Sequence, residues 1–275
     1  MNSSLQKAQD GTITLNITIP KSEVAKTKQE VISSLSKSAN VPGFRKGKAP
    51  KKLIEEKVDE EKLREEILKK LLPTAYFEAV KQHKLNPVLN PKIHIDKIEK
   101  NSDWTFQAVT CEAPKIELGD YKKRIAEVSA KSKIIIPGKE QQPVSLDEIV
   151  KALLAGVSGE IPSILVEQEV DRLLSQTLDE VKTLGLTLEQ YLASTNRTVS
   201  SIREEYKSKA QNDIKLEFAL QKVADSESIT VEDKEIDEAI AKAKNETERE
   251  QMIANKYVLA SILRQQKTFD YLKNL

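Results

Sequence analysis

Residues 12–19, with the sequence TITLNITI, determine how the chain begins to fold. Isoleucine or leucine occupies every second position, and threonine or asparagine occupies the positions between them. This period of two, with its β-branched side chains, predicts a strand that buries one face. Pro20 ends the strand, and Ser22 then fits the N-cap of a helix that extends to about Ala39.

The segment that follows predicts a helix–loop–helix. Residues 40–50, NVPGFRKGKAP, contain two Pro and two Gly, which excludes regular secondary structure there. From Lys51 onward apolar residues recur every three or four positions, so the chain returns as a helix. Pro73 predicts a break in that helix, followed by a further helical segment at residues 75–83.

A β-hairpin is predicted further along the chain. Residues 93–96 and 104–109 each alternate between apolar and polar side chains, and residues 100–103 between them are typical of a turn. With residues 12–19 these segments give three strands, which we expect to form one small antiparallel sheet. Residues 1–115 therefore predict an α+β domain with a long helix–loop–helix.

From residue 144 the sequence predicts helices alone. Capping boxes start two of them: Ser145 with Glu148 and Thr187 with Gln190. Ser201 with Glu204 is expected to help start a long helix, and Thr230 with Asp233 to cap another. The last helix is expected over about residues 246–272. These long, charged helices with short turns predict an all-α domain at residues 144–275 with extended arms. We expect most of its apolar side chains to lie in the core. Residues 116–143 are weakly patterned and predict a connector.

Composition excludes several classes of protein. With 8 Gly in 275 residues the chain is not collagen-like, and with Cys111 alone it is not a disulfide scaffold. The longest apolar run, residues 152–157, is far shorter than the ~20 residues of a membrane helix. The N-terminus has neither the basic nor the apolar region of a signal peptide. We therefore expect a cytoplasmic protein with no membrane partner.

The net charge of +1 hides an asymmetry between the two halves. Residues 1–115 carry 21 Lys and Arg against 15 Asp and Glu, whereas residues 116–275 carry 23 against 28. Residues 22–52 alone carry eight basic and two acidic side chains. Such a patch predicts an anionic partner, which could be nucleic acid, an acidic protein or a membrane surface, or else a solvated lysine-rich face.

Sites for catalysis, metals or cofactors are not predicted. His83, His94 and Cys111 are too few and too badly spaced for a metal site. Cys111 and His94 could form a nucleophilic pair on neighbouring strands, but Cys111 alternates in step with Val109 and is better explained as core. The loop at residues 43–48 has three residues between its glycines and Ala49 after the lysine, which does not match a phosphate-binding loop.

The same loop suits a docking surface. Phe44 lies between two glycines with cations beside it, so the ring could supply contact area while the cations pair with phosphate or carboxylate. The alternative is that Phe44 folds back onto its own helices.

This loop resembles the signature of trigger factor, the ribosome-associated bacterial chaperone, which is Gly-Phe-Arg-x-Gly-x-x-Pro. The matching residues are Gly43, Phe44, Arg45, Gly47 and Pro50, with Lys46 at the free position. The resemblance implies that Phe44, Arg45 and Lys46 bind the large ribosomal subunit beside the tunnel exit. Gly43, Gly47 and Pro50 would then shape the loop, and Lys48, Lys51 and Lys52 would add positive charge toward ribosomal RNA.

Residues 147–154 and 161–170 are similar to the family's chaperone domain, and the final helices at about 230–275 fit it less specifically. The resemblance thus covers about 1–115 and 144–275. A typical member carries a prolyl isomerase domain between these parts. Here the stretch has 28 residues with one aromatic, Tyr121, whereas independent domains have at least ~50 residues. We therefore expect a ribosome-binding domain at 1–115, a connector at 116–143 in place of the isomerase, and a chaperone domain at 144–275, without enzyme activity.

The resemblance implies an ATP-independent chaperone that shields hydrophobic segments of nascent or unfolded polypeptides. It is also compatible with a homodimer that forms through the arms. Two alternatives remain open at this point: an RNA-binding protein that uses the basic patch, and a holdase chaperone that works without the ribosome. The sequence does not tell which apolar residues would line a cavity between the arms.

Overall fold

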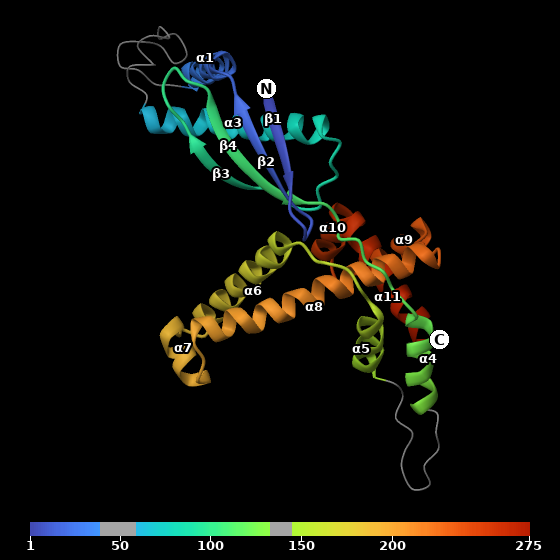
Figure 1. The fold of residues 1–275 in the computed structure, drawn as a ribbon. Coiled ribbons are helices and arrows are strands. Elements are labelled where there is room, and N and C mark those ends of the chain that lie inside the picture. Colours follow the sequence, from blue (N-terminus) through green and yellow to red (C-terminus); the bar gives the residue numbers. More distant parts are fainter. Residues whose placement is uncertain (39–58, 133–144) are drawn as a thin grey trace. The chain divides into compact units, whose positions relative to one another are not determined.

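The computed structural model describes residues 1–38, 59–132 and 145–275. They divide into two compact units, Met1–Ala113 (unit 1) and Pro114–Leu275 (unit 2), and each unit has its own hydrophobic core (Figure 1).

Unit 1 contains a four-stranded antiparallel sheet with the order β1-β2-β4-β3. Its strands are β1 (Asn2–Lys7), β2 (Thr12–Ile19), β3 (Lys92–Lys97) and β4 (Trp104–Cys111). The sequence predicts three of them, and β1 is additional. Strand β1 gives no alternating pattern because Leu5 is its one apolar side chain, and pairing with β2 rather than apolar periodicity defines it.

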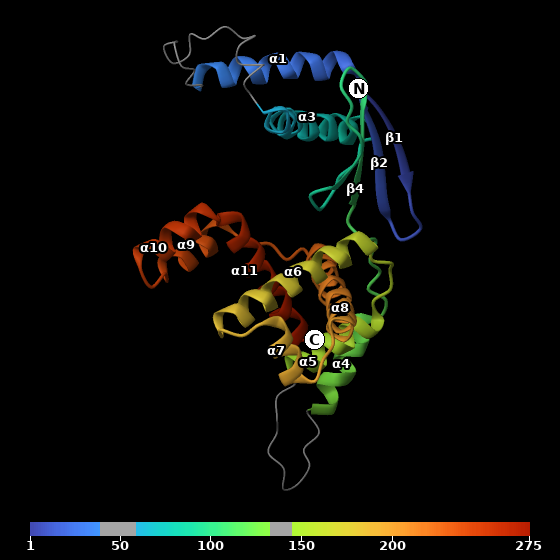
Figure 2. The ribbon, with the colours of Figure 1, turned by 90° about the vertical axis from the view of Figure 1, so that its left-hand side faces the viewer.

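Helices α1 (Lys21–Ser38) and α3 (Glu60–Gln82) cover one face of this sheet (Figure 2). The odd positions of β2, from Ile13 to Ile19, are fully or almost fully buried against them. The even positions of β2 are threonine and asparagine and are half-buried, as expected for a sheet with one face open to water. The α+β fold predicted for this part of the chain is confirmed.

The break predicted at Pro73 is absent, because α3 continues through it to Gln82. Proline removes one backbone hydrogen bond and usually bends a helix. Leu71 and Ala75, on either side of Pro73, are both buried in the core of unit 1, and this packing holds the helix together across the missing bond.

Unit 2 has a base made of four helical segments. They are α4 (Tyr121–Ser132), α5 (Leu146–Gly156), the second half of α8 (Val199–Ser226) and α11 (Lys256–Lys273). Ile125, Leu153 and Leu272 are fully buried where these helices meet. The described part of the predicted connector, residues 116–132, belongs to this unit, because Ile116, Tyr121 and Ile125 contribute to its core.

Two helical arms extend from this base (Figures 1 and 2). The first consists of α6 (Ser163–Thr183), α7 (Leu188–Thr195) and the first half of α8, with a small core around Val170, Ala210 and Ile214. The second consists of α9 (Asp233–Ala241), α10 (Glu246–Ala254) and the start of α11. The prediction of an all-α part with extended arms is thus confirmed.

Three predicted helix boundaries of unit 2 are wrong by a few residues. Helix α8 starts earlier than predicted, because Thr198 caps it in a capping box with Ser201. Helix α9 starts later, because Glu232 is its N-cap and donates its backbone N–H to the carboxylate of Glu235. The last predicted helix is interrupted at Asn255, which separates α10 from α11.

Candidate functional site

The residues predicted to bind the ribosome lie between α1 and α3, outside the described residues. They are Gly43, Phe44, Arg45, Lys46, Gly47, Lys48, Pro50, Lys51 and Lys52. Their roles therefore stay predictions, and the described surface that bears on client binding is the pair of arms in unit 2.

The first arm exposes large apolar side chains near its tip. Leu184 is 72% exposed and Val199 59%, and three further leucines nearby are more than a third exposed. We call this set, Leu178, Leu184, Leu186, Leu188 and Val199, the α6–α7 patch. Several large apolar side chains exposed on one arm are candidates for a surface that binds another molecule.

Turn chemistry places these leucines outside the core. Helix α6 ends at Thr183, and Gly185 then takes a positive φ of 71°, which glycine adopts without strain. Thr187 starts α7 in a capping box with Gln190. Leu184, Leu186 and Leu188 therefore alternate through a turn and do not follow a helical stripe. This alternation in the sequence LGLTL is the signal that could have identified them.

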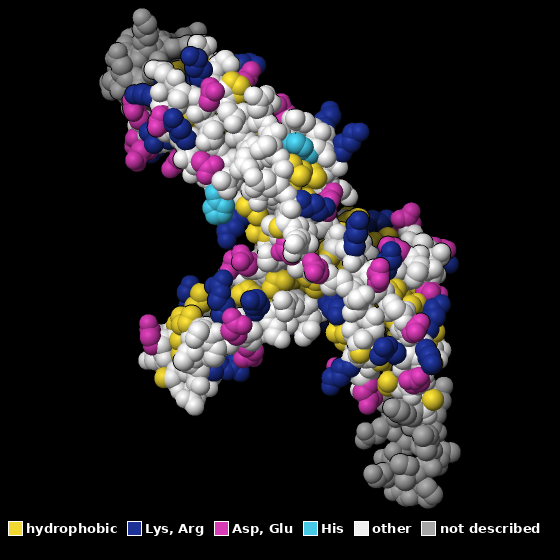
Figure 3. All heavy atoms as spheres, in the orientation of Figure 1, with side chains coloured by type: hydrophobic (Ala, Val, Ile, Leu, Met, Phe, Trp, Pro, Cys, Tyr) yellow, Lys and Arg dark blue, Asp and Glu magenta, His cyan; other side chains and the backbone are white. Residues whose placement is uncertain are grey.

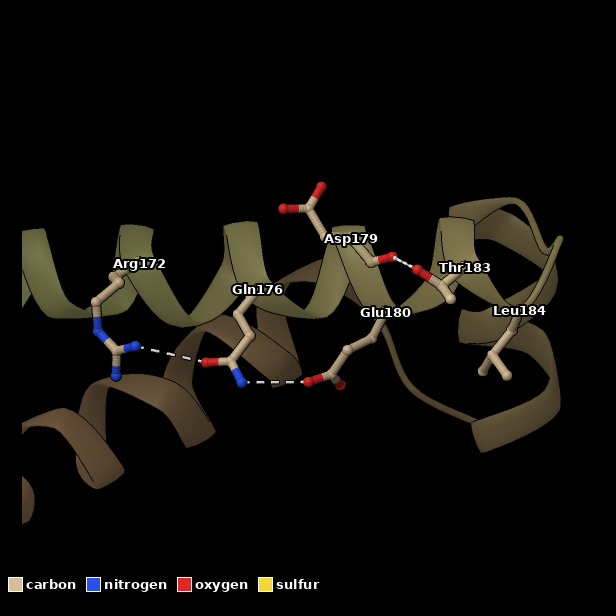
Figure 4. Close-up of a pocket in the computed structure, with 6 residues that line it drawn as sticks. All are labelled: Arg172, Gln176, Asp179, Glu180, Thr183 and Leu184. Carbon is tan, nitrogen blue, oxygen red and sulfur yellow. Dashed lines mark hydrogen bonds between the residues drawn. The ribbon is translucent and has the colours of Figure 1, made fainter. Parts of the chain in front are cut away.

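A shallow hollow of about 740 Å³ adjoins this patch along α6 (Figure 4). It is lined by Arg172, Gln176, Asp179, Glu180, Thr183 and Leu184. Arg172 donates to Gln176 Oε1 over 3.5 Å, and Gln176 Nε2 donates to Glu180 Oε1 over 3.2 Å, so the polar side chains form a row. Arg172, Gln176 and Glu180 are thus already hydrogen-bonded to one another. Leu184 is the apolar side chain that lines the hollow.

The start of that row is an ion pair on α6. Arg172 Nε and Nη2 donate to the two carboxylate oxygens of Glu169 over 2.8 and 2.6 Å. These hydrogen bonds hold the pKa of Glu169 below its ordinary value. The pair stays charged near neutral pH, so it keeps this part of α6 hydrated.

The second arm exposes a similar surface at the junction of α10 and α11. Tyr257 is 89% exposed, and Ile253, Val258 and Ile262 are each about half exposed. We call these four residues the α10–α11 patch. Val258 and Ile262 are thus exceptions to the expectation that most apolar side chains of these helices lie in the core. Lys256, beside the patch, pairs with Asp233 and Asp237 over 3.7 and 3.4 Å.

Charged side chains surround apolar ones on both arms. Figure 3 shows yellow apolar side chains interspersed with Lys, Arg, Asp and Glu over this face of unit 2. Such a surface can hold an apolar segment weakly at several points while the charges keep the protein hydrated.

The cysteine–histidine pair considered from sequence does not come together. In the register of the sheet His94 faces Gln107, whereas Cys111 faces Thr12 and lies four residues further along β4, about 13 Å away. Burial, with a smaller effect from Asp10, raises the pKa of the Cys111 thiol to about 11. Cys111 is therefore a core residue.

The described residues also bear on metal binding and on membrane insertion. Among them, no group of three or more His, Cys, Asp or Glu side chains could hold a metal ion. No described helix has both the length and the apolar character that crossing a membrane requires.

Two family models match the chain. The model for bacterial trigger factor protein matches residues 1–136, and the model for its C-terminus matches residues 139–274. Neither describes an isomerase domain. Together they span almost the whole chain.

Individual relatives agree with these matches. The chain is 33% identical to the trigger factor of Lactococcus lactis subsp. cremoris (strain SK11) over 168 residues, which are 61% of this chain and 37% of that protein. It is 36% identical to the trigger factor of Staphylococcus epidermidis over 122 residues, which are 44% of this chain and 28% of that protein. The matched parts thus span about a third of these curated relatives.

A solved structure of a trigger factor chaperone has the same fold, with a TM-score of 0.67 at 13% identity. It is aligned over 100% of this chain and 99% of that one. The fold, the family models and the curated relatives all agree with a trigger factor. The chain belongs to the bacterial trigger factor family.

Proposed function

We propose that this chain is an ATP-independent chaperone that shields hydrophobic segments of unfolded or nascent polypeptides with its two arms. The observation that carries the proposal is the exposure of large apolar side chains in the α6–α7 and α10–α11 patches. The solved relative is described as having promiscuous substrate recognition in folding and assembly, which is consistent with such surfaces.

The physical basis is the burial of apolar surface. A leucine or tyrosine that is fully buried by a client contributes about 1.5–3 kcal/mol, and a half-buried one contributes less. Several such contacts on two arms give a total affinity that depends little on the client's sequence. Release needs no nucleotide, because each contact is weak and exchanges with water on its own.

The test of client binding is a double substitution on the arms. Leu184→Ser with Tyr257→Ser should raise the chaperone concentration needed to halve the light scattering of an aggregating client by roughly tenfold. Phe77→Ser is the matched control, because Phe77 is 67% exposed but belongs to unit 1 rather than to an arm. Equal protection by the double variant and the wild type would refute client binding at these patches.

We further propose that unit 1 docks on the large ribosomal subunit near the tunnel exit through Phe44, Arg45 and Lys46. The match of residues 1–136 to the family model supports this role. Lys48, Lys51 and Lys52 would add attraction to ribosomal RNA, which salt weakens. The chain would then act in the cytoplasm.

Ribosome co-sedimentation tests the docking. Substituting Phe44, Arg45 and Lys46 by alanine should abolish it, whereas Lys62→Ala with Lys70→Ala, on exposed positions of α3, should leave it unchanged. Undiminished binding of the triple variant contradicts the docking role. Binding to free RNA as tight as to ribosomes would favour an RNA-binding protein, and client protection without ribosome binding would favour a ribosome-independent holdase.

Two finer points belong to the same proposal. Prolyl isomerase activity should be missing, so a proline-limited refolding reaction should not accelerate when the protein is added. A homodimer through the arms would mask the apolar patches, and light scattering at increasing concentration will show whether it forms.

A further inference from the structure

Unit 1 contains a pocket that neither proposed role uses. It lies where the first turns of α1 and α3 meet the connection between β3 and β4, and its volume is about 600 Å³. This falls within the ~300–1,000 Å³ range of pockets that bind small ligands or side chains. The pocket is therefore large enough for a specific occupant.

The interior of the pocket is apolar. Leu63, Ile67 and Trp104 line it and are otherwise buried, while Val24 and Ile98 line it and are half-buried. An apolar group that entered would contact the core of unit 1 directly. A floor of this kind favours an apolar side chain over a free inorganic anion.

The rim is charged and mostly basic. Four cations and two carboxylates line the pocket, namely Lys21, Lys28, Arg64, Lys100, Glu60 and Glu99. Both carboxylates already have lysine partners: Glu60 pairs with Lys100, and Glu99 pairs with Lys97 over 3.1 Å.

Two of the rim cations remain available to an incoming carboxylate. Lys21 and Arg64 form no ion pair within 4 Å with any residue that the structure describes, although the charge of Arg64 contributes to lowering the pKa of Glu60. Four cations against two carboxylates leave the lining of the pocket with an excess of positive formal charge. An arginine and a lysine beside an apolar floor suit a carboxylate that adjoins an apolar group.

Hydrogen bonds fix the walls of the pocket. The backbone N–H of Lys21 donates to Asp103 Oδ1 over 2.8 Å, which ties the start of α1 to the β3–β4 connection. Trp104 Nε1 donates to the carbonyl oxygen of Glu99 over 3.1 Å, which holds the indole against that connection. The pocket is thus formed before anything binds, so binding requires little ordering of the protein.

We propose that this pocket binds a short acidic and apolar segment of a partner protein. The segment places a leucine or phenylalanine side chain on the floor at Trp104, and a neighbouring aspartate or glutamate between Lys21 and Arg64. RNA is disfavoured, because single-stranded RNA needs exposed aromatic faces for stacking, whereas Trp104 is 7% exposed. The site lies in unit 1, so the proposal is independent of client binding by the arms.

Trp104 is the one tryptophan in the 275-residue sequence, so its fluorescence reports on this pocket alone. The full-length protein is titrated with the peptide acetyl-Glu-Leu-Phe-Glu-amide, and with the same peptide carrying glutamine in place of both glutamates. We expect a saturable change in Trp104 emission with the acidic peptide and a roughly tenfold weaker affinity for the glutamine peptide.

Variants separate the rim from the floor. Lys21→Gln with Arg64→Gln should weaken the acidic peptide roughly tenfold or more. Lys62→Gln, which removes a positive charge from the same turn of α3 outside the pocket, should not. Ala25→Phe should fill the pocket and abolish binding without harming the fold, because Ala25 lines the pocket and is solvent-exposed.

The proposal is overturned if neither calorimetry nor Trp104 emission detects the acidic peptide. It is equally overturned if both peptides bind alike, if the charge variant binds like the wild type, or if an RNA oligonucleotide displaces the peptide from the pocket. Circular dichroism of each variant confirms that it is folded before it is titrated.

Discussion

Glu227, at the C-cap of α8, joins three segments of unit 2 through one carboxylate. It accepts hydrogen bonds from the hydroxyls of Tyr121 and Tyr271 over 2.9 and 2.7 Å, and it pairs with Lys122 Nζ over 2.7 Å. These hydrogen bonds lower the pKa of Glu227 to about 2, and the bond from Lys122 has the largest effect. Burial and the bond to Glu227 raise the pKa of Tyr121 to about 12. The ionised carboxylate is therefore the form that holds α4 and α11 to α8.

We expect Glu227→Gln to lower the Tm of unit 2 by several degrees at pH 7. A lowered pKa means that the contribution of Glu227 is complete above the unfolded pKa of about 4.5 and is lost as the pH falls through about 2. The difference in Tm between variant and wild type should therefore shrink as the pH falls below about 4.5. Thermal melts of both proteins across this range check the prediction. Glu217→Gln, at an exposed site on the same helix, is the control. A difference in Tm between Glu227→Gln and the wild type that stayed constant below about pH 4.5 would contradict the prediction.

At the scale of elements, the approach of α4 to α5 depends on glycines. Gly119, just before α4, has a φ of +54°, and a Cβ there would lie 2.7 Å from the carbonyl oxygen of Gly156 at the end of α5. Gly185 between α6 and α7 also has a positive φ, of +71°, but has no atom within 4 Å of such a Cβ. The two glycines thus share the backbone requirement and differ in steric crowding.

Gly185→Ala should cost about 1 kcal/mol, the cost of a left-handed conformation for a residue with a Cβ. Gly119→Ala should cost more, about 2–4 kcal/mol, because the backbone of α5 must also shift. Urea unfolding of the two variants gives both values. If Gly119→Ala proves no more destabilising than Gly185→Ala, then α4 and α5 do not approach each other as closely as described.

Periodicity predicted the elements whose one face is buried, such as β2 and the long helices, because burial itself imposes the pattern. It could not predict β1, whose side chains are mostly polar and whose existence depends on pairing with a strand beyond the next turn. The sequence also wrongly predicted a helix break at Pro73, because core contacts of Leu71 and Ala75 outweigh the tendency of proline to interrupt a helix.

The candidate functional surfaces also differ in how far the sequence predicts them. A docking role for residues 43–50 can be predicted because their residue types and spacing are specific, and it stays a prediction because they lie outside the described residues. The arm patches were not predicted, since Leu184 and Val258 are chemically identical to leucines and valines of the core. For Val258, which lies inside a regular helix, only the tertiary arrangement decides whether the side chain contacts water. For Leu184, the alternation LGLTL at the turn is a local signal of exposure.

At the scale of the whole molecule, the sign of the net charge changes close to the boundary between the two units, and each unit has its own hydrophobic core. Residues 1–115 carry the excess of basic side chains and residues 116–275 the excess of acidic ones, close to the boundary between Ala113 and Pro114. The core that contains Leu15 and its partner on β4, Ala108, is built from residues of unit 1. The remaining core clusters of the described chain belong to unit 2. Each half of the chain therefore has what it needs to fold by itself.

We predict that the fragments 1–113 and 114–275 fold separately and divide the proposed activities between them. Fragment 1–113 should co-sediment with ribosomes, and raising KCl from about 50 to about 200 mM should weaken that binding tenfold or more, because on this proposal its excess cations would face phosphate. Fragment 114–275 should protect an aggregating client with little dependence on salt, because apolar contacts carry that activity. Trp104 emission verifies that the first fragment is folded, and circular dichroism does so for the second. Ribosome binding by fragment 114–275, or salt-independent binding by fragment 1–113, would show that the charge asymmetry does not direct docking.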